Sequence, residues 1–120
     1  VNDRYKNDMK DILDNKIAPT NYRFVMAKGY EYQGQPIVVS EYGGFKLAGT
    51  EGWGYDGEAK DAEDLVRKYD EITSAYKKME KVCGFCYTQL TDVYHETNGL
   101  MSFDRTPKVP LKEIKKINER

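Results

Sequence analysis

The chain has 120 residues, a length that holds one domain at most, with 19 Lys and Arg residues against 20 Asp and Glu residues. The net charge of −1 disfavours a nucleic-acid-binding surface, because such surfaces are strongly basic. No apolar run approaches the roughly 20 residues of a membrane helix and no secretory signal is recognised, so we expect no membrane partner. Nothing in the sequence indicates a cellular location.

The first quarter of the chain contains two short predicted elements. A helix that ends before Pro19 is predicted by apolar residues at helical spacing: Met9, Ile12, Leu13 and Ile17. A short strand is predicted by an alternating set: Tyr22, Phe24 and Met26.

The middle of the chain predicts a strand–helix–strand unit. Residues 36–40 and residues 84–89 read as strands, and residues 58–81 read as a long amphipathic helix between them. Asp56 or Asp61 can cap the start of this helix. Its apolar face consists of Ala62, Leu65, Val66, Tyr69, Ile72, Tyr76 and Met79. We therefore expect two parallel strands joined by a helical crossover.

The connections around this unit are also informative. Residues 42–57 form a long loop with six glycines and Trp53, and a loop of this length is more typical of a site wall than of a simple turn. A last helix is predicted to start near Pro110, with an apolar face of Leu111, Ile114 and Ile117. The order of elements predicts an α/β fold with a parallel sheet.

Two strands are too few for a stable sheet of their own. The apolar strands need partners that the chain does not supply. The first residue is Val1 rather than Met, so we expect a processed protein or a piece of a longer one. Together these features predict a fragment of a larger (β/α) barrel.

Glu41 is the principal candidate for chemistry. It follows an apolar strand and precedes Gly43 and Gly44, two glycines that allow the backbone to leave the strand. A charge at the exit of a buried strand is costly unless it is hydrogen-bonded or used. Parallel barrels keep their catalytic groups at the C-terminal ends of strands. The alternative is an acidic residue that opens a surface loop.

A second set of candidates follows the second strand. Gln89, Asp92 and His95 lie at or beyond its end, and parallel strands would bring them to the same rim as Glu41. We expect these three residues to bind substrate, and the alternative is a solvated loop with an exposed His95. A serine hydrolase is disfavoured, because no serine lies in a Gly-x-Ser-x-Gly motif.

The two cysteines raise a competing function. Cys83 and Cys86 form Cys-Gly-Phe-Cys, which can be a redox pair or half a metal site. The pair follows a helix and enters a strand, whereas a thioredoxin-type pair opens a helix. One His cannot complete a zinc site with them, so we expect no metal and no cofactor. Residues three apart on a strand point to opposite faces, which predicts unbridged thiols.

The two strand segments resemble glycoside hydrolase family 2, the β-galactosidase and β-glucuronidase family. Residues 36–44, Pro-Ile-Val-Val-Ser-Glu-Tyr-Gly-Gly, resemble the family's strand 7. Residues 84–92, with residues 98–100 and 104–108, resemble its strand 8 and the following loop. The similarity extends from about Tyr30 onward. It implies that residues 1–120 are the C-terminal portion, about the last two βα units, of a (β/α)8 TIM barrel.

The resemblance also implies an activity, namely retaining hydrolysis of a β-glycoside with Glu41 as the nucleophile. The family's sugar-packing aromatic residue, usually Trp, corresponds to Tyr87, and Trp53 lies in the loop expected to bind substrate. The family's acid/base glutamate follows an asparagine at the end of strand 4. The sole Asn-Glu pair here is Asn118-Glu119, in the last predicted helix, so the acid/base residue is expected outside this chain.

Unpaired strand edges and exposed apolar faces favour association. We therefore expect the isolated chain to form a homo-oligomer without glycosidase activity. Two alternative functions are open. A non-catalytic carbohydrate-binding or interaction module would not hold an ionised, buried Glu41, and a thiol redox protein would need a reactive Cys83 or Cys86.

Overall fold

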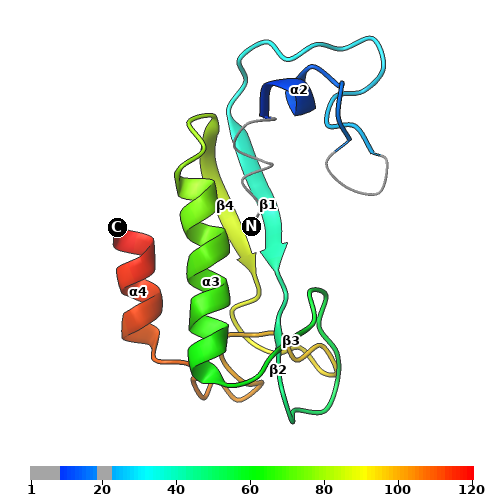
Figure 1. The fold of residues 1–120 in the computed structure, drawn as a ribbon. Coiled ribbons are helices and arrows are strands. Elements are labelled where there is room, and N and C mark those ends of the chain that lie inside the picture. Colours follow the sequence, from blue (N-terminus) through cyan, green and yellow to red (C-terminus); the bar gives the residue numbers. More distant parts are fainter. Residues whose placement is uncertain (1–8, 19–22) are drawn as a thin grey trace. The chain divides into compact units, whose positions relative to one another are not determined.

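The structure, a computed structural model, describes residues 9–18 and 23–120. They belong to two separate units, Val1–Pro36 and Ile37–Arg120. In the first unit the described residues form the short helix α2, Met9–Leu13, and otherwise irregular chain (Figure 1).

The first unit differs from both sequence predictions. The helix ends before Ile17, and Asn15 adopts a positive φ of 56° just beyond it. The Asn15 side chain donates to the Met26 carbonyl at 2.8 Å and accepts from the Met26 N–H at 3.0 Å. Because these bonds occupy the Met26 backbone, no strand forms at Phe24 and Met26. Tyr22, the third residue of that predicted strand, lies outside the described residues.

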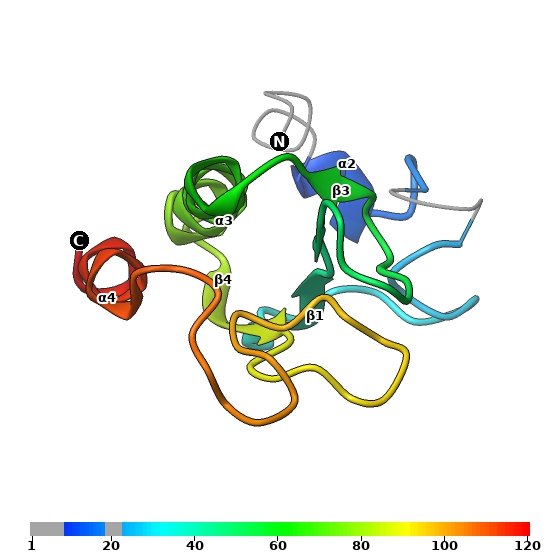
Figure 2. The ribbon, with the colours of Figure 1, turned by 90° about the horizontal axis from the view of Figure 1, so that it is seen from below.

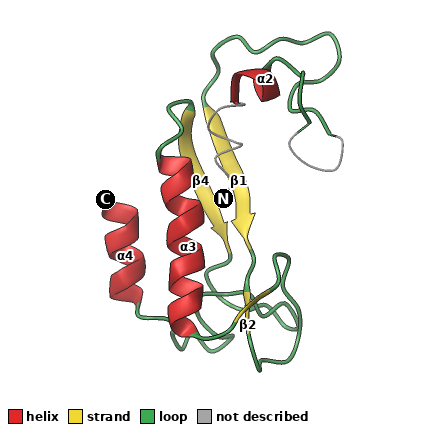
Figure 3. Ribbon diagram, in the orientation of Figure 1, coloured by secondary structure: helices red, strands yellow, loops and turns green. Residues whose placement is uncertain are grey.

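The second unit contains the predicted strand–helix–strand arrangement. It consists of β1 (Ile37–Gly43), α3 (Ala62–Lys77) and β4 (Val82–Thr88). β1 and β4 pair in parallel, with both arrows in the same direction in Figure 3. A second parallel pair is formed by the two-residue strands β2 (Lys46–Leu47) and β3 (Glu58–Ala59). The predicted α/β class with a parallel sheet is confirmed.

The last helix, α4 (Leu111–Glu119), packs beside α3 (Figure 1). The Tyr69 hydroxyl of α3 donates to Asn118 Oδ1 at 2.8 Å, and Lys77 Nζ donates to the Asn118 carbonyl at 2.8 Å. The cation of Lys77 thus satisfies the C-terminal end of α4, where the helix dipole favours positive charge. The core consists of Phe45, Ala59, Leu65, Tyr69, Leu100, Val109, Ile114 and Ile117. No helix in the described part of the chain is long and apolar enough to cross a membrane.

Asp61, one of the two predicted caps, begins α3. Its Oδ1 accepts from the Asp64 N–H at 2.8 Å, and Asp64 Oδ2 accepts in turn from the Lys60 N–H at 3.0 Å. The guanidinium of Arg67, bonded to the same carboxyl group, holds the pKa of Asp64 below its usual range. Glu58, where the sequence predicted the helix to start, lies in β3 instead.

We expect Asp61→Ala to lower the free energy of unfolding by about 1 kcal/mol, because the Asp64 N–H loses its capping acceptor. Urea denaturation of the two proteins measures the difference. Lys112→Ala, at an exposed position of α4, is the control and should have little effect. Equal stability of Asp61→Ala and native protein would contradict the capping role.

β1 is less buried than its apolar sequence predicts. Val38 is 60% exposed, and Ser40 and Glu41 are also exposed. β1 has β4 as its one neighbour in the described sheet, and α3 covers a single face of the pair. The expectation of a buried strand is therefore wrong for these residues, because no second layer from the described residues of the second unit covers their side of the sheet.

Candidate functional site

Glu41 lies within β1, and not after its end. The register of β1 against β4 shifts between Val39 and Tyr42, where β1 holds one residue more than β4. Ser40 and Glu41 therefore lie on a β-bulge. Bulges redirect side chains and are frequent next to active sites.

Tyr42, the neighbour of Glu41, points into an aromatic cluster beneath α3. Its hydroxyl hydrogen-bonds Thr73 Oγ1 at 2.7 Å, and its ring centroid lies 5.1 Å from that of Tyr76. Burial raises the pKa of Tyr42 well above its usual range. The register places Ser40 and Glu41 opposite Cys86, whose two neighbours on β4, Phe85 and Tyr87, contact Tyr42 on the α3 side. Glu41 therefore lies on the open face of the sheet, opposite α3.

Tyr87 belongs to the same buried cluster. Its ring lies 5.4 Å from that of Tyr42 and 4.9 Å from that of Tyr69, and its hydroxyl is buried. Burial raises the pKa of Tyr87 as well. At Gly43, with a φ of +92°, a Cβ would overlap the Tyr87 ring, so this packing requires glycine. Strand alternation places the partly buried Tyr87 ring on the α3 side, where it packs against the core, and its predicted sugar contact stays a prediction.

The loops that follow β1 and β4 meet at the C-terminal end of the sheet, which Figure 2 views directly. The Trp53 N–H donates to the His95 carbonyl at 2.9 Å, and the Thr97 N–H donates to the Trp53 carbonyl at 2.9 Å. Thr97 Oγ1 donates to the Glu51 carbonyl at 2.8 Å. The backbones of Trp53 and His95 therefore lie side by side, as we expect for two loops that leave the same end of a parallel strand pair.

Trp53 and Tyr55 form a half-exposed aromatic pair in this region. They are 47% and 57% exposed, and their ring centroids lie 5.0 Å apart at an interplanar angle of 86°. The Tyr55 N–H donates to the Gly44 carbonyl at 2.8 Å, and its hydroxyl donates to Glu96 Oε2 at 3.3 Å. Partial desolvation, with the negative charges of Glu96 and Glu41, raises the pKa of Tyr55. The phenol therefore keeps its proton, which it donates to Glu96.

Sequence reasoning did not select Tyr55 as a site residue. It placed Glu96 among the polar side chains after the second strand, but not among the residues expected to bind substrate. The alternation of aromatic residues with glycine in Gly52-Trp53-Gly54-Tyr55 was an available signal. Glu96 gave no signal beyond its position in a polar loop.

Gln89 supports the loop after β4. Its Nε2 donates to Asn98 Oδ1 at 2.9 Å and approaches the Glu96 carbonyl at 3.4 Å. Asn98 is fully buried, at 0% exposure. These contacts order the loop backbone, and a substrate contact of Gln89 stays a prediction.

Asp92 forms a buried ion pair with Lys108. Lys108 Nζ lies 2.5 Å from Asp92 Oδ1, and both side chains are 9% exposed. Asp92 Oδ1 also accepts from the Gly99 N–H at 2.9 Å, while Lys108 Nζ donates to the Thr97 carbonyl at 3.0 Å. The pair connects both ends of the loop after β4. Asp92 therefore has a structural role, and its direct contact with substrate stays a prediction.

The remaining candidates lie at the surface. The His95 side chain is exposed, so its predicted substrate contact also stays a prediction. Asn118 and Glu119 lie in α4, where Asn118 accepts from Tyr69 and Glu119 lies 3.6 Å from Lys115. These contacts stabilise α4 and do not contribute to a catalytic site.

The two cysteines are free and exposed. Cys83 Sγ donates to the Ile37 carbonyl at 3.2 Å. We expect alkylation of the unreduced protein to add two labels, read as the mass of the intact chain. A fraction protected from alkylation until a reductant is added would indicate a disulfide and would favour the redox alternative.

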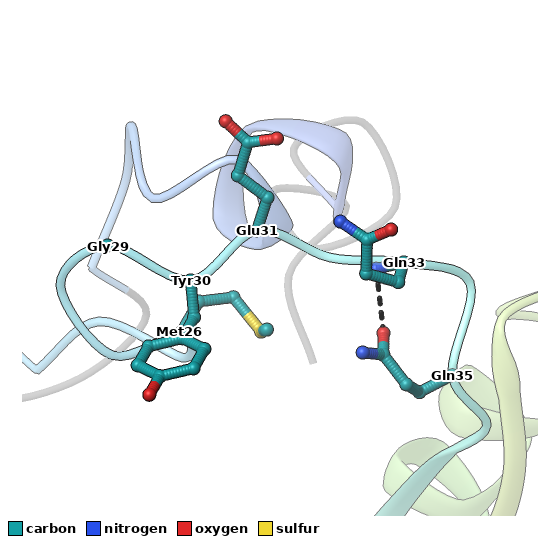
Figure 4. A pocket seen from close by; sticks show the side chains of 6 residues that line it. All are labelled: Met26, Gly29, Tyr30, Glu31, Gln33 and Gln35. Carbon is teal, nitrogen blue, oxygen red and sulfur yellow. Dashed lines mark hydrogen bonds between the residues drawn. The ribbon is translucent and has the colours of Figure 1, made fainter.

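A separate pocket of about 490 Å³ lies in the first unit (Figure 4). It is lined by Met26, Gly29, Tyr30, Glu31, Gln33 and Gln35. In Figure 4 the Met26 side chain lies beside the Tyr30 ring, and the Glu31 carboxylate points to the other side of the chain. None of the site residues predicted from the sequence lines this pocket. The candidate site is therefore placed in the second unit, around Glu41, where the predicted residues lie.

Within residues 9–18 and 23–120, no group of three or more His, Cys, Asp or Glu side chains is arranged to hold a metal ion. No protein-family model matches this sequence, and no curated protein matches it. Function is therefore inferred from the geometry around Glu41 and from the resemblance of the two strand segments.

Proposed function

We propose that this chain is a C-terminal segment of the (β/α)8 barrel of a retaining β-glycosidase, with Glu41 as the nucleophile. The position of Glu41 is the main support. It lies on a bulge near the C-terminal end of a parallel strand, on the face opposite α3. In a barrel that face lines the interior, and the helices form the outer ring.

The arrangement of the other elements agrees with this proposal. β1, α3, β4 and α4 follow the order of two consecutive βα units. α3 packs on the sheet through Tyr42 and on α4 through Tyr69. The loops after β1 and β4 meet through Trp53 and His95, at the edge where barrel enzymes hold substrate.

The chemistry assigns Glu41 one half of a pair of carboxyl groups about 5–5.5 Å apart. Its carboxylate attacks the anomeric carbon, and the bond to the leaving oxygen breaks as that oxygen takes a proton from the second carboxyl group. The second group then removes a proton from water, which attacks the anomeric carbon and releases Glu41. That second group is supplied from outside this chain.

The product's stereochemistry tests the proposal. Proton NMR of the full-length protein acting on an aryl β-glycoside should show the β-anomer as the first sugar formed, because two displacements restore the configuration. An α-anomer as first product would exclude a nucleophilic Glu41.

A non-catalytic carbohydrate-binding module is the second candidate. It is favoured by the exposure of Glu41 and by the half-exposed Trp53 and Tyr55, which are typical of a sugar-binding surface. The two candidates differ in the full-length protein, because a binding module hydrolyses no glycoside.

The isolated chain is expected to form a homo-oligomer and to lack glycosidase activity. β1 and β4 each have one neighbour in the described sheet, and exposed strand edges pair with further chains. Leu90, at 63% exposure, and Val38, at 60%, add apolar surface. Size exclusion with light scattering measures the mass, and an aryl β-glycoside assay measures turnover. A stable monomer would contradict the first part, and measurable turnover would contradict the second.

A further inference from the structure

We propose that Trp53, Tyr55 and Glu96 form a binding subsite for the pyranose ring of an uncharged β-glycoside. The inference rests on the proposed function for the choice of a glycoside as ligand. It adds the residues that hold the sugar and the class of sugar that fits.

The first support is the chemistry of the three side chains. A pyranose has an apolar C–H face and a rim of hydroxyl groups. The edge-to-face rings of Trp53 and Tyr55, both about half exposed, offer apolar area for the sugar face. The Glu96 carboxylate, which accepts from the Tyr55 hydroxyl at 3.3 Å, retains further acceptor positions for sugar hydroxyls.

The second support is the rigidity of this surface before any ligand arrives. The Trp53 backbone is bonded on both sides to the loop after β4, through His95 and Thr97 at 2.9 Å each. A Cβ at Gly52 would overlap the His95 carbonyl, so only glycine permits this close approach of the two loops. A side chain held in place in advance loses less entropy on binding, which increases affinity.

The third support is charge, which limits the class of sugar. Glu96 and Glu41 both act on the Tyr55 phenol and make its surroundings negative. Lys46 Nζ is paired with Glu58 at 2.9 Å, and Lys108 is buried against Asp92. The carboxylate of a uronic acid would meet like charge here, whereas neutral hydroxyls donate to carboxylates. The subsite therefore favours uncharged hexosides over uronides.

The test uses the full-length protein labelled with ¹⁵N-tryptophan. Trp53 is the single tryptophan of these 120 residues, and its indole N–H resonance is assigned by its absence from Trp53→Phe. Methyl β-galactopyranoside or methyl β-glucopyranoside should shift this resonance saturably, and methyl β-glucuronide should bind more weakly. Tyr55→Ala should weaken the affinity for the neutral glycosides roughly tenfold. Tyr30→Ala, at a tyrosine of the first unit that is 72% exposed, is the matched control and should leave the titration unchanged.

Three results would overturn the inference: no saturable shift with either neutral glycoside, equal affinity in Tyr55→Ala, or tighter binding of the glucuronide. Glu41→Gln separates the subsite from the nucleophile. It should keep saturable binding of the neutral glycosides, and it should weaken the discrimination against the glucuronide because one of the two negative charges near Tyr55 is removed. If full-length Glu41→Gln hydrolyses glycosides normally while the titration holds, the proposed function fails and the subsite stands. If the native full-length protein is a retaining hydrolase but the titration fails, the subsite alone is wrong.

Discussion

Replacing Glu41 with Gln in the full-length protein is expected to abolish β-glycoside hydrolysis, with a loss in kcat on the order of 10⁴-fold or more. The amide has nearly the same shape as the carboxylate, but it cannot form the glycosyl-enzyme bond. Because Glu41 is exposed on a bulge, the substitution should leave the free energy of unfolding within about 0.5 kcal/mol of native. Initial rates with an aryl β-glycoside measure the effect.

Glu51→Gln is the matched control for this experiment. It makes the same change of charge and shape at an exposed residue of the loop after β1. Its rate should stay close to that of the native protein. Near-normal turnover in Glu41→Gln would contradict the assignment of Glu41 as the nucleophile.

Lys108→Met is expected to destabilise the chain by about 3–5 kcal/mol, because it leaves the buried Asp92 carboxylate without its ion-pair partner. Among the described residues, the Gly99 N–H alone would still donate to that carboxyl group. A loss of this size is a large fraction of the 5–15 kcal/mol typical of domains. Urea unfolding followed by circular dichroism measures it.

Two variants make this measurement specific. Lys112→Met removes an exposed lysine of α4 and should change stability little. The double variant Asp92→Asn with Lys108→Met should recover part of the loss, since no buried charge then lacks a partner. If Lys108→Met were no more destabilising than Lys112→Met, the ion pair would not hold the loop.

The long-range pattern of the second unit was predictable because it depends on periodic apolar residues. The face that includes Leu65 and Tyr69 indicated α3, and the apolar residues beside Ile37 indicated β1. Asp61 was recognisable as a cap from its position before that face. Periodicity predicted that these elements exist, and their order predicted that the two strands pair in parallel. The predicted ends of the helices differ from the observed ends by a few residues.

Features that depend on one residue's register or on distant partners were not predictable. The bulge at Glu41 comes from the pairing of β1 with β4, which no local pattern specifies. The same pairing directs the Tyr87 ring toward Tyr69 of α3, and a shift of one residue in the register would turn it to the other face. The ion pair of Asp92 with Lys108 joins residues 16 apart in a loop without periodicity.

Covalent trapping of the nucleophile tests the central claim most directly. The full-length protein is incubated with an activated 2-deoxy-2-fluoro β-glycoside, digested at low pH and analysed by mass spectrometry. The fluorine slows hydrolysis of the glycosyl-enzyme, so the fluorosugar should accumulate as an ester on the peptide that contains Glu41. Attachment to a different carboxylate, or normal turnover without any labelled peptide, would contradict the assignment of Glu41 as the nucleophile.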